Sequence, residues 1–112
     1  MDVTELFFSV AVRDMQRATA FYVGALGATV TFASPGWSSL RIAGVRLGLG
    51  LDPRHTPSRV GLHAVTHDLA AACADVERAG GRVVSPSNEV VPGVFAADVT
   101  DTEGNTFSLS KR

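Results

Sequence analysis

The sequence predicts an α+β fold built from two similar β-α-β-β-β units. The first observation behind this prediction is a repeat. Segment 8–15 (FSVAVRDM) resembles segment 62–69 (LHAVTHDL), with Asp14 and Asp68 separated by 54 positions. The second observation is that each half begins with an apolar strand pattern, continues into an amphipathic helix pattern and then returns to strand patterns. A repeat close to half of the 112 residues indicates two units packed against each other, with a site expected between them.

Length and composition are those of one globular domain. Units of about 55 residues bury too little surface to be stable alone, so we expect a single domain, 1–112, with units at 1–51 and 60–112 and a linker at 52–59. A net charge of −1 with no basic run argues against a nucleic-acid partner. The sequence contains no run of about 20 apolar residues, so no membrane span is predicted. It also shows no signal-peptide pattern, and a cytoplasmic location is therefore expected.

The first unit is marked by helix-capping residues as well as by its apolar pattern. Residues 6–12 are mostly apolar, with β-branched and aromatic side chains, which predicts a strand. Asp14 is the predicted N-cap of a helix over Met15–Leu26, which Gly27 ends. Thr19 is the one polar residue in the buried stripe of that helix, where its hydroxyl can bond a carbonyl one turn back. Three further strands are predicted, at 28–33, 37–42 and 45–51.

The second unit repeats this order. Asp68 is the predicted cap of its helix, and Gly80-Gly81 ends that helix. The single Cys73 lies on the buried stripe, cannot form an internal disulfide, and is interpreted as a small core residue. Segment 86–92 begins and ends with proline and is interpreted as a loop over a site. Strands are predicted at 60–66, 82–85, 93–99 and 106–110, the last two joined by the turn 101–105 (DTEGN).

Alternation along the strands separates a face that packs on the helices from an opposite face. The opposite face is unusual for a solvent face, because it mixes Gly, Ser, His and Arg with aromatic residues. Gly48 and Gly50 alternate on one strand and leave a smooth wall, at a cost in strand stability. Two interpretations stay open at this point: a cavity for a ligand, or room for the side chains of a partner subunit.

Three features together resemble a known family. The paired units, the helix motif Ala20-Phe21-Tyr22 followed by Ala25-Leu26-Gly27, and the closing turn 101–105 are similar to those of the vicinal oxygen chelate superfamily. That superfamily contains glyoxalase I, extradiol dioxygenases, fosfomycin-resistance transferases and bleomycin-resistance proteins. The resemblance covers nearly the whole chain. It implies that the eight strands form a curled mixed sheet around the site, the glyoxalase/bleomycin resistance fold, and that the protein is a homodimer.

The resemblance also implies where a metal would bind, and the residues at those positions are not metal ligands. Metal-binding members have a His on the first strand, where this chain has Phe7, and a His at the matching place in the second unit, here Gly61. They have a Glu on the last strand, here Ser108, and some add a Glu in the row that here contains Gly48 and Gly50. Phe and Gly side chains donate no electron pair, and a lone Ser hydroxyl is a poor ligand. We therefore predict no metal and no other cofactor.

The opposite face supplies the predicted binding site. Its aromatic residues are expected to stack on a ligand, and its charged residues and histidine to anchor polar groups, the arginines suiting an acidic or carbonyl-rich ligand. The alternatives are a core or interface role for the tryptophan and solvated or ion-paired arginines. Phe95 and Asp98 have opposite parity on one strand, so both predictions require a bulge or bend there. The predicted site consists of Phe7, Ser9, Trp37, Ser39, Arg41, Arg46, Gly48, Gly50, His63, Phe95, Asp98 and Ser108.

These observations favour a protein that binds a small organic molecule, an antibiotic or metabolite, without chemical conversion. One alternative is a metal-independent lyase, isomerase or cyclase with His63 or Asp98 as its base. Others are a metal-dependent enzyme of the same family with non-standard ligands, and a structural or regulatory subunit without a ligand. No nucleophile motif and no phosphate-binding loop is present.

Overall fold

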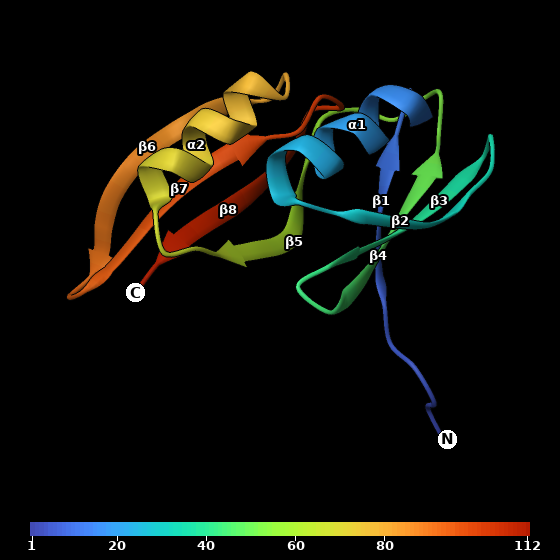
Figure 1. Ribbon diagram of the computed structural model, residues 1–112, viewed down its shortest axis with the longest axis horizontal. Coiled ribbons are helices and arrows are strands. Elements are labelled where there is room, and N and C mark those ends of the chain that lie inside the picture. The colour runs from blue at the N-terminus through green and yellow to red at the C-terminus, as the bar shows by residue number, and fades with distance from the viewer.

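The computed structural model describes residues 1–112 and contains two helices and eight strands in the predicted order (Figure 1). The elements of the first half are β1 (Phe8–Val12), α1 (Met15–Leu26), β2 (Thr29–Ala33), β3 (Trp37–Ile42) and β4 (Val45–Leu51). Those of the second half are β5 (Ser58–Val65), α2 (Leu69–Arg78), β6 (Arg82–Val91), β7 (Val94–Thr100) and β8 (Asn105–Lys111). We refer to β1–β4 with α1 as the N-terminal module and to β5–β8 with α2 as the C-terminal module. The predicted repeat of β-α-β-β-β is confirmed.

The strands form two four-stranded mixed sheets with the same topology. Their orders are β1-β4-β3-β2 and β5-β8-β7-β6, and in each sheet the first and last strands of the module run parallel. The predicted α+β class with eight strands is confirmed, and the strands lie in two mixed sheets, where the resemblance implied one curled sheet. Within one chain the strands are divided between two sheets, because β1 and β5 each pair on one side only and leave the other side free.

The predicted helix caps are confirmed, whereas the role predicted for Thr19 is wrong. The carboxylate of Asp14 accepts a hydrogen bond from the Arg17 N–H, and that of Asp68 from the Ala71 N–H, both at 3.0 Å. Gly27 ends α1 in the left-handed conformation, with φ 69°. The Thr19 hydroxyl is buried and has no hydrogen-bond partner, so it does not bond the carbonyl one turn back.

One hydrophobic core joins the two modules. It contains Val10, Val12, Phe21 and Tyr22 from the N-terminal module together with Phe107 from the C-terminal module, and α1 contacts α2. The rings of Phe21 and Phe107 meet edge to face with centroids 6.3 Å apart. Both helices cover the same side of the molecule in Figure 1. No helix is long and apolar enough to cross a membrane.

The predicted loop at 86–92 is wrong, because most of this segment is strand. β6 runs without interruption from Arg82 to Val91, although its pairing with β7 shifts register at three places. Proline removes a backbone donor, which normally argues against a strand. β6 is an edge strand, however, so Pro86 is tolerated where one side of the backbone has no partner. The segment therefore extends the sheet.

Cys73 is partly buried and packs against the hydrophobic core, as predicted. Burial raises the pKa of its thiol, and the nearby Glu77 carboxylate raises it further. A thiol with a raised pKa is less nucleophilic at neutral pH, which fits a packing role.

Candidate functional site

The pairing register gathers the predicted residues of the N-terminal module on one face of its sheet. Trp37, Ser39 and Arg41 of β3 lie directly opposite Gly50, Gly48 and Arg46 of β4. Opposite partners in an antiparallel pair point to the same side of a sheet. Ser9 of β1 pairs with Gly48 and so joins the same face. We call this surface, consisting of Phe7, Ser9, Trp37, Ser39, Arg41, Arg46, Gly48 and Gly50, the aromatic face.

The two glycines of the aromatic face leave room for the tryptophan of the same chain. A β-carbon on Gly48 would overlap the indole of Trp37, and one on Gly50 would lie 3.4 Å from that ring. The indole N–H donates a hydrogen bond to the Ser39 hydroxyl at 3.0 Å, which fixes the orientation of the ring. The sequence alone suggested a smooth, empty wall above these glycines. That space is filled. It holds Trp37, which remains partly exposed.

Phe7 and Arg46 extend this surface. The Phe7 ring meets Trp37 edge to face, with centroids 6.3 Å apart, and the Arg46 guanidinium lies 4.1 Å above the Phe7 ring. Glu5, on the segment before β1, accepts a long hydrogen bond from Arg46 at 3.3 Å. The result is a partly exposed surface of two aromatic rings and a cation, typical of a site that stacks on flat molecules.

The C-terminal module carries a polar counterpart on its own sheet. Asp98 accepts hydrogen bonds from the Arg59 guanidinium and the Ser108 hydroxyl, both at 2.9 Å. These residues line a cavity of about 260 Å³, together with Ser85 and Asn88 of β6. Sequence reasoning missed Arg59 because it assigned that residue to the linker, whereas β5 begins at Ser58.

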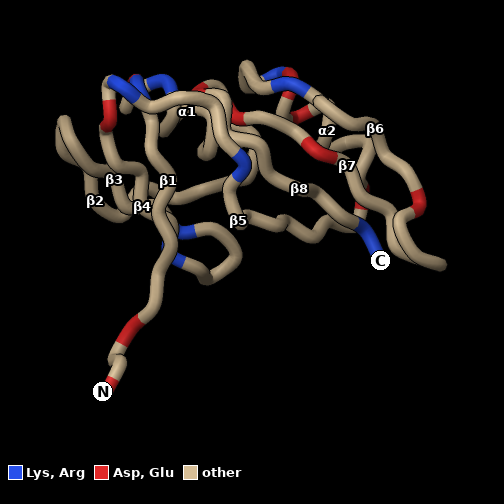
Figure 2. The backbone as a smooth tube through the Cα atoms, turned by 180° about the vertical axis from the view of Figure 1, so that it is seen from behind, with Lys and Arg blue, Asp and Glu red and all other residues tan.

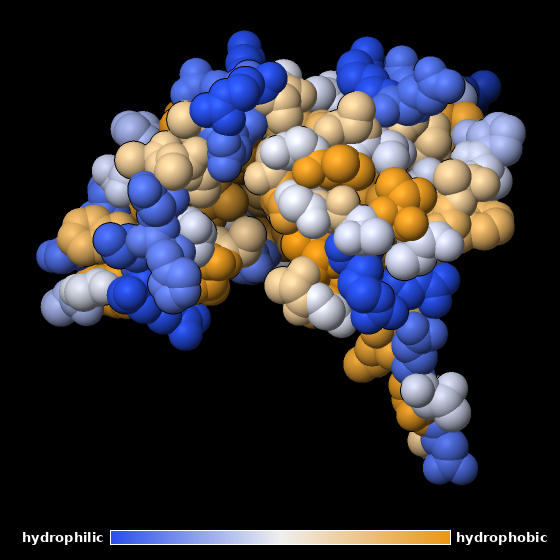
Figure 3. All heavy atoms as spheres, viewed as in Figure 1, coloured by the Kyte–Doolittle hydropathy of each residue, from blue (hydrophilic) through white to orange (hydrophobic).

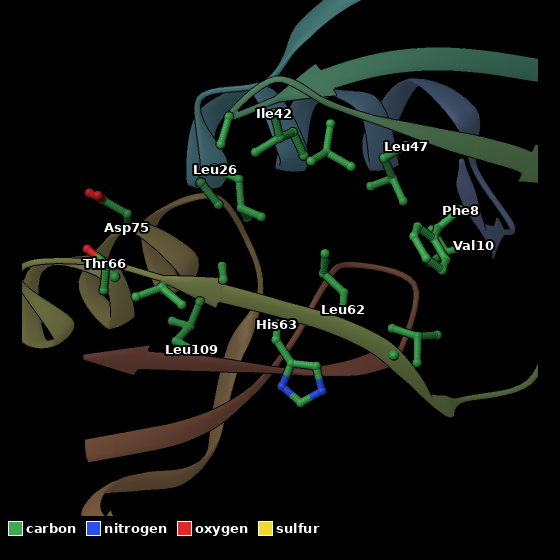
Figure 4. Close-up of a pocket in the computed structure, with 18 of the residues that line it drawn as sticks. Phe8, Val10, Leu26, Ile42, Leu47, Leu62, His63, Thr66, Asp75 and Leu109 are labelled. Carbon is green, nitrogen blue, oxygen red and sulfur yellow. The ribbon is translucent and has the colours of Figure 1, made fainter. Parts of the chain in front are cut away.

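The sheet register brings His63, the predicted alternative base, close to Asp98 along one row. His63 pairs with Ser108, and Ser108 with Asp98, so the three residues form one row across β5, β8 and β7. His63 is nevertheless exposed, and no hydrogen bond joins it to Ser108 or Asp98. In Figure 4 it points away from the other labelled residues. A general base is normally oriented by a second group, and Asp98, which would be that group here, is already held by Arg59 and Ser108.

Phe95 lies on the other side of its strand, so its predicted place beside Asp98 is wrong. The pairing of β7 with β8 runs from Phe95 to Thr100 without a shift. The register shifts fall instead between β6 and β7, where they do not alter the alternation along β7. Phe95 therefore shares the helix-facing side with Ala97 and Val99.

A larger cavity lies between the modules, where the repeat predicted a site, but of the predicted site residues only Ser9, Arg46 and His63 line it. Its volume is about 800 Å³, and most of its lining is apolar. Figure 4 shows side chains from both modules around it, and Figure 3 shows apolar atoms in the hollow between the two halves. It is lined from the helix-facing rows by residues that include Phe8, Val10, Leu26, Leu47, Leu62 and Leu109. The aromatic face and the Asp98 cavity are thus separate surfaces within one chain.

The side chains of the aromatic face and of the Asp98 cavity do not form a set of ligands that suits a divalent metal ion. Phe7, Gly61 and Ser108 occupy the positions that the family resemblance assigns to ligands. No group of three or more His, Cys, Asp or Glu side chains is close enough to hold an ion. Ser108 already donates its hydroxyl proton to Asp98. These residues therefore do not fit the metal site of the metal-binding members.

Comparisons with known proteins agree with the fold. The family model described as Glyoxalase/Bleomycin resistance protein/Dioxygenase superfamily matches residues 6–109. No curated protein matches the chain. Among solved structures, a glyoxalase/bleomycin resistance protein/dioxygenase family enzyme from Burkholderia phytofirmans PsJN has a TM-score of 0.84 at 16% identity, covering 96% of this chain and 98% of that chain.

Two further structures are similar over nearly the full length. TnmS3, an antibiotic binding protein from Streptomyces sp. CB03234, has a TM-score of 0.72 at 28% identity, with 99% of this chain and 98% of that chain covered. The fosfomycin resistance protein FosX from Listeria monocytogenes, in a mutant complexed with Mn(II) and 1S,2S-dihydroxypropylphosphonic acid, has a TM-score of 0.79 at 17% identity. That match covers 96% of this chain and 90% of the FosX chain.

Proposed function

Because the chain belongs to the glyoxalase/bleomycin resistance protein/dioxygenase superfamily, we propose that it binds a small organic molecule on the aromatic face and releases it unchanged. The observation that carries this proposal is the seating of Trp37. Two glycines and the Ser39 hydroxyl hold the indole flat against the sheet, and its outer side stays partly exposed. Glycine weakens a strand interior, so the presence of two glycines beneath one partly exposed ring favours a binding role for that ring.

The side chains of the aromatic face and of the Asp98 cavity support binding of a ligand rather than its chemical conversion. The candidate bases are the exposed His63, which no hydrogen bond to Ser108 or Asp98 orients, and Asp98, which is already paired with Arg59. The donor set does not fit a metal, so the metal-dependent reactions of the family have no ligands of the usual kind here. The 28% identity to TnmS3, an antibiotic binding protein, favours the same class of function.

Substituting Gly48 by Ala is expected to displace the indole and weaken ligand binding about tenfold, the loss of roughly one good stacking contact. Gly50→Ala is the matched control, because its β-carbon would make only ordinary contact with the ring. Trp37 is the only tryptophan, so its indole N–H gives a single NMR signal that reports on this surface. Antibiotics and metabolites are screened for those that shift this signal, and their affinities are compared across both variants.

Two results would contradict the proposed function. A ligand whose affinity is unchanged in Gly48→Ala would bind elsewhere on the chain. Consumption of a ligand by the wild-type protein, abolished in His63→Ala with binding retained, would establish the metal-independent enzyme instead.

We also propose that the functional form is a homodimer. Within one chain the aromatic face and the Asp98 cavity do not share a common space, and β1 and β5 both have a free edge. Phe8, which lines the larger cavity, is 70% exposed. A second copy would cover this apolar surface and pair the free edges, which are otherwise prone to non-specific association.

Phe8→Asp is expected to convert the dimer to a monomer, as measured by sedimentation equilibrium. Phe32→Asp is the control, because Phe32 is also exposed (56%) but lies on β2, at the opposite edge of the same sheet. A wild-type protein that stays monomeric at high concentration, or equal effects of both substitutions, would exclude this interface.

A further inference from the structure

The aromatic face contains two arginines that the fold does not require. Arg41 and Arg46 are directly opposite each other on β3 and β4, so both side chains leave the sheet on the same side. Like charges in this position destabilise a strand pair. They are the only basic residues of the β3–β4 hairpin, and Figure 2 shows them as two blue segments on it.

Little in the chain offsets this pair of charges. Arg41 is exposed, takes part in none of the ion pairs of the molecule, and donates only to the Gly44 carbonyl in the adjoining turn. The one carboxylate near Arg46 is that of Glu5, which is itself 55% exposed and lies 3.3 Å away. A contact of this kind is worth little in solution. The hairpin end of the aromatic face therefore has an excess of positive charge.

The charges and the rings lie within reach of one ligand. Trp37, Ser39 and Arg41 alternate along β3, which places the Cα atoms of Trp37 and Arg41 roughly 13 Å apart. The extended arginine side chains shorten this separation, and the Arg46 guanidinium already lies over Phe7, beside Trp37. Guanidinium groups bind carboxylates through paired hydrogen bonds.

From this juxtaposition we propose that the ligand is an aromatic acid, with its rings on Trp37 and Phe7 and its carboxylate on Arg41 and Arg46. This inference rests on the proposed function and adds the chemical class of the ligand. A cationic ligand is disfavoured, because the two guanidiniums face a single ion-paired carboxylate, that of Glu5. The two arginines are then explained as anion-binding residues that cost the free protein stability.

The test compares 2-naphthoate with 2-naphthamide, which share their rings and differ in charge. Binding is followed by the Trp37 indole N–H signal and by calorimetry. In the wild-type protein, 2-naphthoate is expected to bind at least about tenfold more tightly than the amide, because it gains charge-assisted hydrogen bonds. The preference is expected to shrink as salt screens the charges. Arg41→Gln combined with Arg46→Gln is expected to abolish the preference, and the corresponding double Lys variant to retain part of it.

A stability measurement separates a binding role from a structural one. Arg41→Gln alone is expected to leave the melting temperature unchanged or raise it, since it removes a repulsion. The same substitution is expected to weaken the binding of 2-naphthoate. Equal affinities for acid and amide would overturn the inference and leave the proposed function standing, because the aromatic face would still bind. If neither probe shifts the indole signal but a library compound does, the inference also fails. If no compound of any class shifts it, the proposed function fails as well.

Discussion

Substituting Glu103 by Ala is expected to lower the free energy of unfolding by about 3 kcal/mol, the low end for breaking a buried ion pair. The Glu103 side chain is fully buried. It lies in the turn between β7 and β8 but contacts the start of α1 in the other module. Its carboxylate accepts hydrogen bonds from the Arg13 and Asp14 N–H groups at 2.8 and 2.9 Å and from the Arg17 guanidinium at 2.8 Å. Alanine would leave these donors without a partner between the modules.

The stabilisation from Glu103 is expected to depend on pH. Burial raises the pKa of its carboxyl group, but hydrogen bonds from Arg17, Thr102, Asp14 and Arg13 outweigh burial and hold the pKa at about 2. A carboxyl group whose pKa is lower in the folded state stabilises the fold above its unfolded pKa, near 4.3, and loses that contribution as pH falls toward 2. The unfolding free energy of the wild-type protein should therefore fall across this range more steeply than that of Glu103→Gln.

Urea unfolding between pH 7 and pH 3 provides the measurement, and Asp75→Ala is the control. Asp75 pairs with Arg78 on the surface of α2, and both side chains are exposed, so its loss should change stability by less than about 0.5 kcal/mol. Arg17 is half-exposed, which is why we expect the low end of the range for Glu103. Equal effects of Glu103→Ala and Asp75→Ala at pH 7 would show that the buried carboxylate does not hold the modules together.

Gly81→Ala is expected to destabilise the protein by at least about 3 kcal/mol, the upper range for overpacking. A β-carbon at this position would overlap the Thr100 carbonyl oxygen and lie 2.7 Å from the Phe21 ring and 2.8 Å from Val76. The carbonyl belongs to the β7 backbone, and Phe21 and Val76 are fully or almost fully buried, so none of the three has space to move. Thermal and urea unfolding both measure this change.

Gly24→Ala is the matched control for this substitution. Gly24 lies within α1, and the nearest atom to an added β-carbon is that of Ala79, at 3.6 Å, an ordinary contact. Alanine also has a higher helix propensity, so Gly24→Ala should stabilise the protein by about 0.5–1 kcal/mol. If Gly81→Ala lowers the free energy of unfolding and Gly24→Ala raises it, the loss at Gly81 is due to close packing between α2 and β7. A neutral Gly81→Ala would refute that packing.

Much of the fold was predictable because its signals are local. Asp14 and Asp68 cap their helices as predicted, since a short acidic side chain before an apolar stripe satisfies the free N–H groups of the first turn. Strand alternation placed Trp37, Ser39 and Arg41 on one face, and the β3–β4 register confirms this arrangement. The same rule put Phe95 and Asp98 on opposite faces, and the bulge needed to unite them does not occur on β7.

The errors arose where a contact with a distant residue decides the outcome. Segment 86–92 has loop composition but extends β6, because an edge strand tolerates Pro86. Gly48 and Gly50 appeared to leave an empty wall, yet the residue that fills it is Trp37, on the neighbouring strand. Arg59 was assigned to the linker and proves to pair with Asp98, 39 positions away.

The sequence by itself determined the two β-α-β-β-β units, their helix ends and the residues that share each face, because capping and periodicity act over a few neighbouring positions. Tertiary structure alone decided that Trp37 lies on the glycines, that Glu103 joins one module to the helix of the other, and that the aromatic face and the Asp98 cavity remain apart within one chain. Those outcomes depend on which side chains meet across strands and between modules. No local pattern encodes such meetings, since they result from packing the whole chain around one core.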